Sequence, residues 1–184
     1  MTEILAIVSM AAATGLRVAL PLLLLGLLSG PQLWSQVPLF SQLPAAAVVG
    51  LLVSGSTAEL VLTKNRHSQR LLLLTELSLS PWSGAIAGVA MARKGGIEGR
   101  LALLMGLTSA LLALVIQLLQ VAWMFRPLPL PLWVPIGVDG LCIGLAVLAF
   151  RWPQGGGLVA LLLLWLVIRT GYRWRQVTPR PPKS

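Results

Sequence analysis

The sequence predicts an all-α, polytopic helical membrane protein with about six apolar segments. The chain has 184 residues, of which 57% are hydrophobic and only 10% are charged. Its mean hydropathy is +0.86, so it is too apolar to cover a soluble globule and too hydrophobic to be disordered. Apolar runs of about twenty residues recur along the chain, and each is long enough to cross roughly 30 Å of hydrocarbon as a helix.

The segments are placed by their length and by the polar, proline and glycine residues between them. In chain order they cover residues 4–28, 45–63, 71–92, 101–125, 134–150 and 158–174. We therefore expect residues 1–174 to form a single transmembrane helical domain and residues 175–184 to form a disordered cytosolic tail. Because the first segment follows Glu3 rather than a positive stretch, we expect it to remain as a span and not to be removed as a signal peptide.

The distribution of Lys and Arg favours six spans with the N- and C-termini cytosolic. In that arrangement most basic residues lie on the cytosolic side, namely Lys64, Arg66, Arg70, Arg126, Arg169, Arg173, Arg175, Arg180 and Lys183. One loop disagrees, because it carries Arg93, Lys94 and Arg100 on the outer side. A re-entrant segment 71–92, bent at Pro81, would return this loop to the cytosol and leave five spans. Six spans is the interpretation that we prefer.

The expected location is a bacterial-type inner (plasma) membrane, with a thylakoid membrane as the alternative. The net charge of +9 comes from 14 Lys and Arg against 5 Asp and Glu. The basic residues flank apolar runs and form no single stripe, so we expect anionic lipids at the basic cytosolic loops as partners and no nucleic acid. A homo-oligomer and membrane-complex partners both stay open.

Charged residues inside the apolar segments are the candidate functional residues. Arg17 falls near the middle of the first segment, where inserting an arginine costs about 2.5 to 3.5 kcal/mol, so it needs a partner. The candidates are Glu59, Glu76 and Asp139, which six spans would place at one depth, roughly 6 to 9 Å inside the cytosolic edge. We expect the Arg17 side chain to reach toward that edge and form a buried polar cluster with them. With one cation and three carboxyls, at least one acid should be protonated or hold a cation.

Two interpretations of this cluster stay open. In the first, the chain is a small transporter or channel-like protein, and the cluster lies on the pathway of a substrate, a small cation or a proton. In the second, the chain is a non-catalytic scaffold or assembly subunit of a larger membrane complex, and the ion pairs lock helices together. Pro21 leaves the carbonyl of Arg17 without its helical donor and predicts a kink, as Pro81 does in its own segment. Such breaks occur both at transporter sites and in plain bundles.

Glycines spaced one helical turn apart predict where helices pack closely. Gly84 and Gly88 form one such pair, and Gly140 and Gly144 form another. Helix packing is the expected role of both pairs, with pore lining as the alternative. The glycines at 155–157 are interpreted as a flexible turn.

The sequence contains no recognisable catalytic or metal-binding motif, so we expect no enzyme, no cofactor and no metal site. His67 is the one histidine, and it lies in the basic stretch KNRHSQR. Cys142 is the one cysteine, which excludes an intrachain disulfide and a multi-cysteine metal site, and we expect it to serve packing. Neither GxSxG nor GxxxxGK[ST] occurs.

Several runs along the chain resemble an uncharacterised bacterial integral membrane family, domain of unknown function 4126. They are ATGLRVALPLLLLGLL at 13–28, AELVLTK at 58–64, SPWSGAIAG at 80–88 and VDGLCIGLAVLAFRWP at 138–153. The resemblance carries the family pattern onto Gly15, Leu16, Arg17, Pro21, Glu59, Lys64, Pro81, Gly84 and Asp139. The chain departs from the pattern at Thr63 and Val138, where the family has acids, so an ion held by those acids in relatives would bind poorly here. No activity follows from the resemblance.

Overall fold

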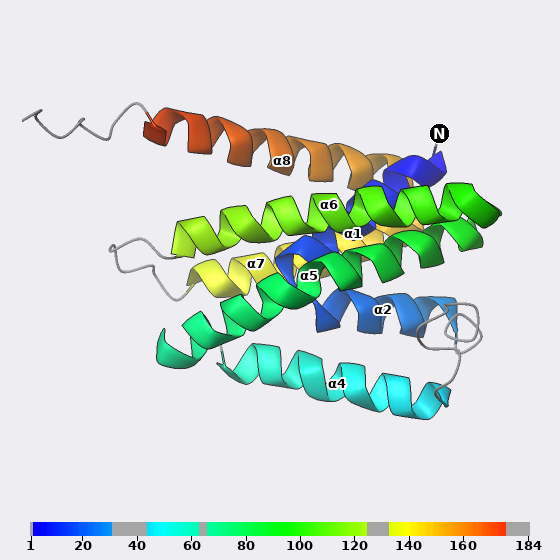
Figure 1. Ribbon diagram of the computed structural model, residues 1–184, viewed down its shortest axis with the longest axis horizontal. Coiled ribbons are helices and arrows are strands. Elements are labelled where there is room, and N and C mark those ends of the chain that lie inside the picture. Colours follow the sequence, from blue (N-terminus) through cyan, green and yellow to red (C-terminus); the bar gives the residue numbers. More distant parts are fainter. Residues whose placement is uncertain (1, 31–43, 63–65, 125–132, 176–184) are drawn as a thin grey trace, which may run out of the picture.

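The computed structural model describes residues 2–30, 44–62, 66–124 and 133–175, and every regular element within them is a helix. The predicted all-α class is therefore confirmed for these residues. In chain order the helices are α1 (Thr2–Leu16), α2 (Ala19–Ser29), α4 (Ala45–Leu62), α5 (Arg66–Lys94), α6 (Gly99–Met124), α7 (Trp133–Arg151) and α8 (Pro153–Arg175). From α4 onward the helices run back and forth along one common axis (Figure 1). Residues 176–184 of the predicted tail lie outside the described residues.

Helix α1 lies at the centre of the bundle, where it packs against α5, α6, α7 and α8 (Figure 1). All of residues 9–15, SMAAATG, are buried. Small side chains let neighbouring helices approach closely, and a Cβ added to Gly15 would lie 2.8 Å from the backbone oxygen of Ala113 on α6. Helix α2 packs mainly against α4 and α7.

The first apolar segment turns back on itself halfway through the bundle. Helices α1 and α2 extend from its middle toward the same end (Figure 1). A Cβ on Gly95 would lie 2.9 Å from the carboxyl carbon of Glu3, and Lys94 Nζ lies 3.4 Å from Ser29 Oγ. The start of α1 and the end of α2 therefore both lie beside the last turn of α5. The prediction that residues 4–28 form one span is wrong.

This hairpin also corrects the predicted topology. Helix α1 begins and α8 ends at opposite ends of the bundle, so the termini of the described chain do not share one side (Figure 1). Segment 71–92 contains no hairpin, because it lies within α5, a helix of 29 residues that continues through Pro81. The physical reason for the error is that hydropathy is the same for a long apolar run whether it crosses once or folds into two short helices.

Close packing at glycine is found for one of the two predicted pairs. On α5, a Cβ at Gly84 would lie 2.7 Å from the Cβ of Ala113, and one at Gly88 would overlap Ser109 Oγ, so α5 and α6 meet at these glycines. No described atom lies within 4 Å of a Cβ built on Gly140 or Gly144, so the structure contains no helix contact there.

The interpretation of residues 155–157 as a flexible turn is wrong, because they lie in the first turns of α8. A Cβ on Gly156 would lie 2.6 Å from Ser9 Oγ, and one on Gly157 would lie 2.6 Å from the Cβ of Leu5. These glycines allow α8 to approach α1 closely.

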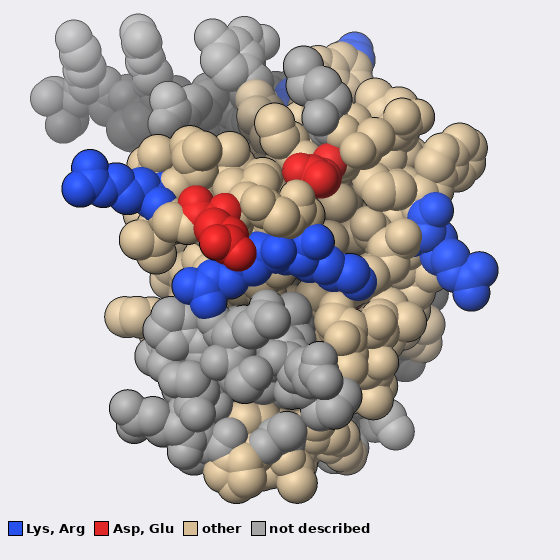
Figure 2. Space-filling model, turned by 90° about the vertical axis from the view of Figure 1, so that its right-hand side faces the viewer, with Lys and Arg blue, Asp and Glu red and all other residues tan. Residues whose placement is uncertain are grey.

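Charged side chains gather at the end of the bundle where α1 begins (Figure 2). The described helix ends there carry Glu3, Arg93, Lys94, Arg100 and Arg151. Between the two ends, large apolar side chains are exposed on the outer helices. Those on α6 include Leu101, Leu103, Leu104, Leu107, Leu111 and Leu118.

One helical segment of the described chain, Gly99–Ala122, is by itself long and apolar enough to cross a membrane. Its most apolar window has a mean hydropathy of 2.3 and is only 33% buried. Length and composition of one helix give weak support for a membrane location, because core helices of soluble proteins pass the same test.

Candidate functional site

The break between α1 and α2 lies at Arg17 and Val18. The amide of Arg17 still donates to the carbonyl oxygen of Ala13 at 3.1 Å, which is the last helical bond of α1. Pro21 is the third residue of α2 and has no N–H to donate back to Arg17, so the helical hydrogen bonding is weakened at the point where α1 ends. At 1.5 Å per residue, the 15 residues of α1 place the break about 22 Å from the start of the helix.

The Arg17 side chain makes two ion pairs at the break. Its Nε donates to Asp139 Oδ1 on α7 at 2.6 Å, and its Nη1 donates to Glu76 Oε1 on α5 at 3.0 Å. Arg17 is 3% exposed and Glu76 is 2% exposed. A buried guanidinium is tolerated when carboxylates accept from it directly, so these pairs offset much of its desolvation. Because the chain turns back at Arg17, the guanidinium lies next to the acids. The side chain does not have to extend toward the cytosolic edge, as was expected for a continuous span.

Glu59 binds the backbone of the hairpin rather than the guanidinium. Its Oε1 accepts a hydrogen bond from the amide of Ala19 at 2.9 Å, which is the first residue of α2. The first amides of a helix lack intrahelical partners and carry partial positive charge, so a carboxylate satisfies both needs. Among the described residues Glu59 forms no ion pair, and its Oε2 has no hydrogen-bond partner although the residue is only 6% exposed.

Glutamines on α6 extend the polar groups beyond the predicted cluster. Gln117 is fully buried, and its Nε2 donates to Glu76 Oε2 at 3.3 Å. No described group donates to the side-chain oxygens of Gln117 and Gln120, or pairs with the hydroxyls of Ser80 and Ser109. The sequence analysis missed these residues. The signal that could have found them is the presence of amide side chains inside an apolar segment.

A cavity of about 610 Å³ lies beside the cluster, between α2, α4 and α5. Glu59 and Glu76 both line it, and most of the remaining lining is apolar. Its large apolar side chains are Leu22, Leu51, Leu52, Leu79, Trp82 and Ile86.

The cysteine of the chain is engaged in packing. The thiol of Cys142 is buried and donates to the carbonyl oxygen of Ala13 at 3.4 Å, which joins α7 to α1. Within the described ranges, no group of three or more His, Cys, Asp or Glu side chains is arranged to hold a metal ion. His67 has no described side chain.

Fold and site together define a class of protein: an all-helical bundle whose first apolar segment is broken and turned back, with a buried ionic cluster at the break. A family model described as Domain of unknown function (DUF4126) matches residues 4–173, and the chain belongs to this family. The predicted family membership is confirmed. A search of curated proteins and a search of solved structures each found no match.

Proposed function

We propose that this chain is a multi-pass integral membrane protein that acts as a small transporter or channel-like protein. In this proposal the pathway passes the break in the first segment, and its polar groups are Arg17, Glu59, Glu76 and Asp139. The role is non-enzymatic, and lipid is the partner that surrounds the bundle.

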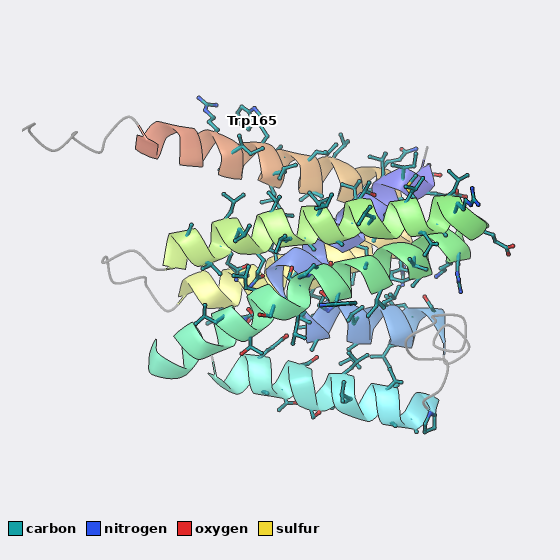
Figure 3. The ribbon with its side chains drawn as sticks, in the orientation of Figure 1. Trp165 is labelled. Carbon is teal, nitrogen blue, oxygen red and sulfur yellow. The ribbon has the colours of Figure 1, made fainter. Side chains whose placement is uncertain are left out.

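The bundle's apolar exterior supports the membrane placement. Exposed large apolar side chains cover α6 and continue along α8, where Leu158, Leu161 and Leu162 are exposed. Trp165 of α8 points away from the bundle (Figure 3) and is 56% exposed. Soluble monomers rarely expose apolar patches of this extent, because their contact with water is unfavourable. Helices α4 to α8 contain 18 to 29 residues and are about 27 to 44 Å long, enough to cross a bilayer.

The proposed topology has five crossing helices, α4 to α8, and a re-entrant hairpin formed by α1 and α2. The sequence that directly follows α4, α6 and α8 contains more Lys and Arg than the sequence that directly precedes these helices, and the three helices finish at the same end of the bundle (Figure 1). The positive-inside rule then places the C-terminus in the cytosol and the N-terminus on the other side. The loop at 93–100 lies at the same end of the bundle as the start of α1 (Figure 1), so this topology keeps Arg93, Lys94 and Arg100 on the outer, less basic side.

A broken helix at mid-depth is the observation that carries the transport proposal. Unpaired backbone groups are tolerated within a membrane only where protein or water satisfies them. Here Glu59 satisfies the amide of Ala19, and the break coincides with the ionic cluster of Arg17. Discontinuous helices whose ends face charged groups near the bilayer midplane are characteristic of transporter binding sites.

The unpaired oxygens on α5 and α6 support a hydrated route to the cluster. Buried polar groups without protein partners are commonly bridged by ordered water. Gln120 and Gln117 lie one turn apart on α6, and Gln117 contacts Glu76. We propose that water bridges these amides and links Glu76 to the cytosolic end of α6, giving a proton or small cation access to the cluster.

A scaffold or assembly subunit is the second candidate function. It is favoured by the two ion pairs of Arg17, which tie the end of α1 to α5 and α7. It is also favoured by the bare, exposed face at Gly140 on α7, where a helix of a second copy or of another membrane subunit fits closely. Affinity purification in mild detergent tests it, because a subunit should recover partners in fixed stoichiometry.

Flux measurements on reconstituted protein test the transport proposal. Liposomes containing the protein should pass protons or a small monovalent cation down an imposed gradient, as read from an entrapped pH- or cation-sensitive dye. Gln117→Leu keeps the volume but removes the amide beside Glu76, so the flux should fall, whereas Glu98→Gln at the exposed end of the bundle should leave it unchanged. Equal flux through protein-free, wild-type and Gln117→Leu liposomes would rule the transport proposal out.

A further inference from the structure

We propose that the cavity between α2, α4 and α5 binds a lipophilic monocation, an alkylammonium that enters sideways from the hydrocarbon of the bilayer. The inference goes beyond the proposed function, because it assigns a ligand to the cavity and not the ion that passes the cluster, and it rests on the membrane placement proposed above.

The cavity has the size and lining of a site for an apolar molecule. Its volume of about 610 Å³ falls within the roughly 300 to 1,000 Å³ typical of small-molecule sites. Leu22 and Leu52 line it on one side, and Leu79 and Ile86 on the other. An alkyl chain would be stabilised there by burial against these side chains.

One end of the cavity is acidic, and a carboxylate oxygen of Glu59 there has no hydrogen-bond donor among the described residues. Glu59 Oε1 is engaged by the amide of Ala19, but no described group donates to Oε2. The positive charge of Arg17 is already shared between Glu76 and Asp139. Among the residues whose side chains the structure describes, none that lines the cavity is Lys or Arg. A buried carboxylate oxygen without a donor is costly, and an ammonium group supplies both a positive charge and N–H donors.

The mouth of the cavity opens on the apolar side of the bundle rather than at its charged ends. Leu51 on α4 is 65% exposed, and Leu79 and Trp82 on α5 are 48% and 62% exposed. Helices α4 and α5 are connected in sequence but make little contact, and Figure 1 shows them diverging away from the end where α4 finishes. In the proposed membrane placement this opening faces lipid chains, so the ligand must be soluble in hydrocarbon at one end.

The combination of an apolar lining, a lipid-facing mouth and an unpaired carboxylate selects against other ligands. An anion would meet Glu59 and Glu76, and no described lining residue offers a cation to neutralise it. A neutral alkyl chain would leave Glu59 Oε2 unsatisfied, because it has no donor. A small hydrated cation would gain nothing from the apolar lining.

Photolabelling of the protein in lipid nanodiscs tests the site. The probe is dodecylammonium with a diazirine in its alkyl chain, and labelled peptides are located by mass spectrometry. We expect saturable labelling of α4 and α5 around Leu51 and Trp82, suppressed by dodecylammonium and much less by dodecanol of the same chain length. Glu59→Gln keeps the acceptor for Ala19 but removes the negative charge, so it should weaken apparent binding about tenfold.

Matched variants on α4 separate occupancy of the cavity from loss of fold. Ala58→Leu adds bulk to the cavity without changing its charge and should reduce labelling. Thr57 directly precedes Ala58 but does not line the cavity, so Thr57→Leu should leave labelling unchanged. Unsaturable labelling, equal competition by dodecanol, or unchanged binding in Glu59→Gln would each overturn the inference. Saturable binding without any ion flux would contradict only the transport proposal, and flux without saturable binding would contradict only the proposed ligand.

Discussion

The amide of Ala19 donates a hydrogen bond of 2.9 Å to Glu59 Oε1, so a carboxylate of α4 caps the helix that begins at the break in the first segment. Val18, at the N-cap position of α2, makes no side-chain capping bond of its own. The cap therefore comes from a distant part of the chain. This contact holds the hairpin against α4 and orients Glu59 toward the cavity.

The capping bond predicts different effects for two substitutions of Glu59. Glu59→Ala should lower the free energy of unfolding by about 1–3 kcal/mol, because the buried amide of Ala19 loses its acceptor. Glu59→Gln retains a side-chain oxygen that can accept the same bond, so it should cost clearly less. Denaturant unfolding in detergent micelles, followed by helical circular dichroism, measures both. Equal losses for the two variants would show that charge, and not the cap, is what matters.

The ion pairs of Arg17 predict a large loss of stability when the guanidinium is removed. Arg17→Ala should cost about 3–5 kcal/mol, because Glu76 and Asp139 are left as uncompensated buried charges. Arg17→Lys should fall between Ala and wild type, because a single ammonium cannot reproduce the fixed fork that reaches both carboxylates. Thermal unfolding in detergent compares them with Arg151→Ala at the exposed end, where the change should stay within about 0.5 kcal/mol. A small effect of Arg17→Ala would mean that the cluster is not buried in the folded protein.

The α5–α6 contact predicts which glycines tolerate a larger side chain. Gly84→Val should destabilise the protein by about 1–3 kcal/mol, because its Cβ would lie 2.7 Å from that of Ala113 and 2.8 Å from a backbone oxygen. Gly140→Val on α7 is the matched control and should be close to neutral in the isolated protein, since nothing lies within 4 Å of its Cβ. The midpoint of thermal unfolding measures both. If Gly140→Val instead disrupts an oligomer seen by cross-linking, the α7 face is an interface between chains.

Hydropathy was sufficient to predict the helical class, and charge inside apolar segments was sufficient to select Arg17, Glu76 and Asp139. A charged residue in an apolar run carries a desolvation cost that demands partners, so its neighbours could be sought among the few acids in other segments. Glu59 was selected for the same reason, but its contact with a backbone amide could not be predicted, because that amide is free only once α1 is broken. The buried Gln117 was missed because an amide carries no charge to mark it.

The course of the first segment could not be predicted from its hydropathy. Arg17 and Pro21 together mark a weak point, but a weak point is compatible with a kink as well as with a reversal. Whether the chain kinks or reverses here depends on contacts with distant parts of the chain, such as that of Lys94 with Ser29. Glycine spacing was similarly limited. It identified the faces at Gly84 and Gly140 equally well, although only the first meets a neighbouring helix among the described residues.

Cysteine accessibility in sealed membrane vesicles tests the reversal at Arg17 most directly. Native Cys142 is fully buried, so it should not react, and single cysteines can be placed at Thr2, Ser29 and Arg169. A membrane-impermeant maleimide should label Thr2→Cys and Ser29→Cys from the same side of the membrane and Arg169→Cys from the opposite side. Labelling of Thr2→Cys and Ser29→Cys from opposite sides would contradict the hairpin and, with it, the placement of Arg17 at its tip.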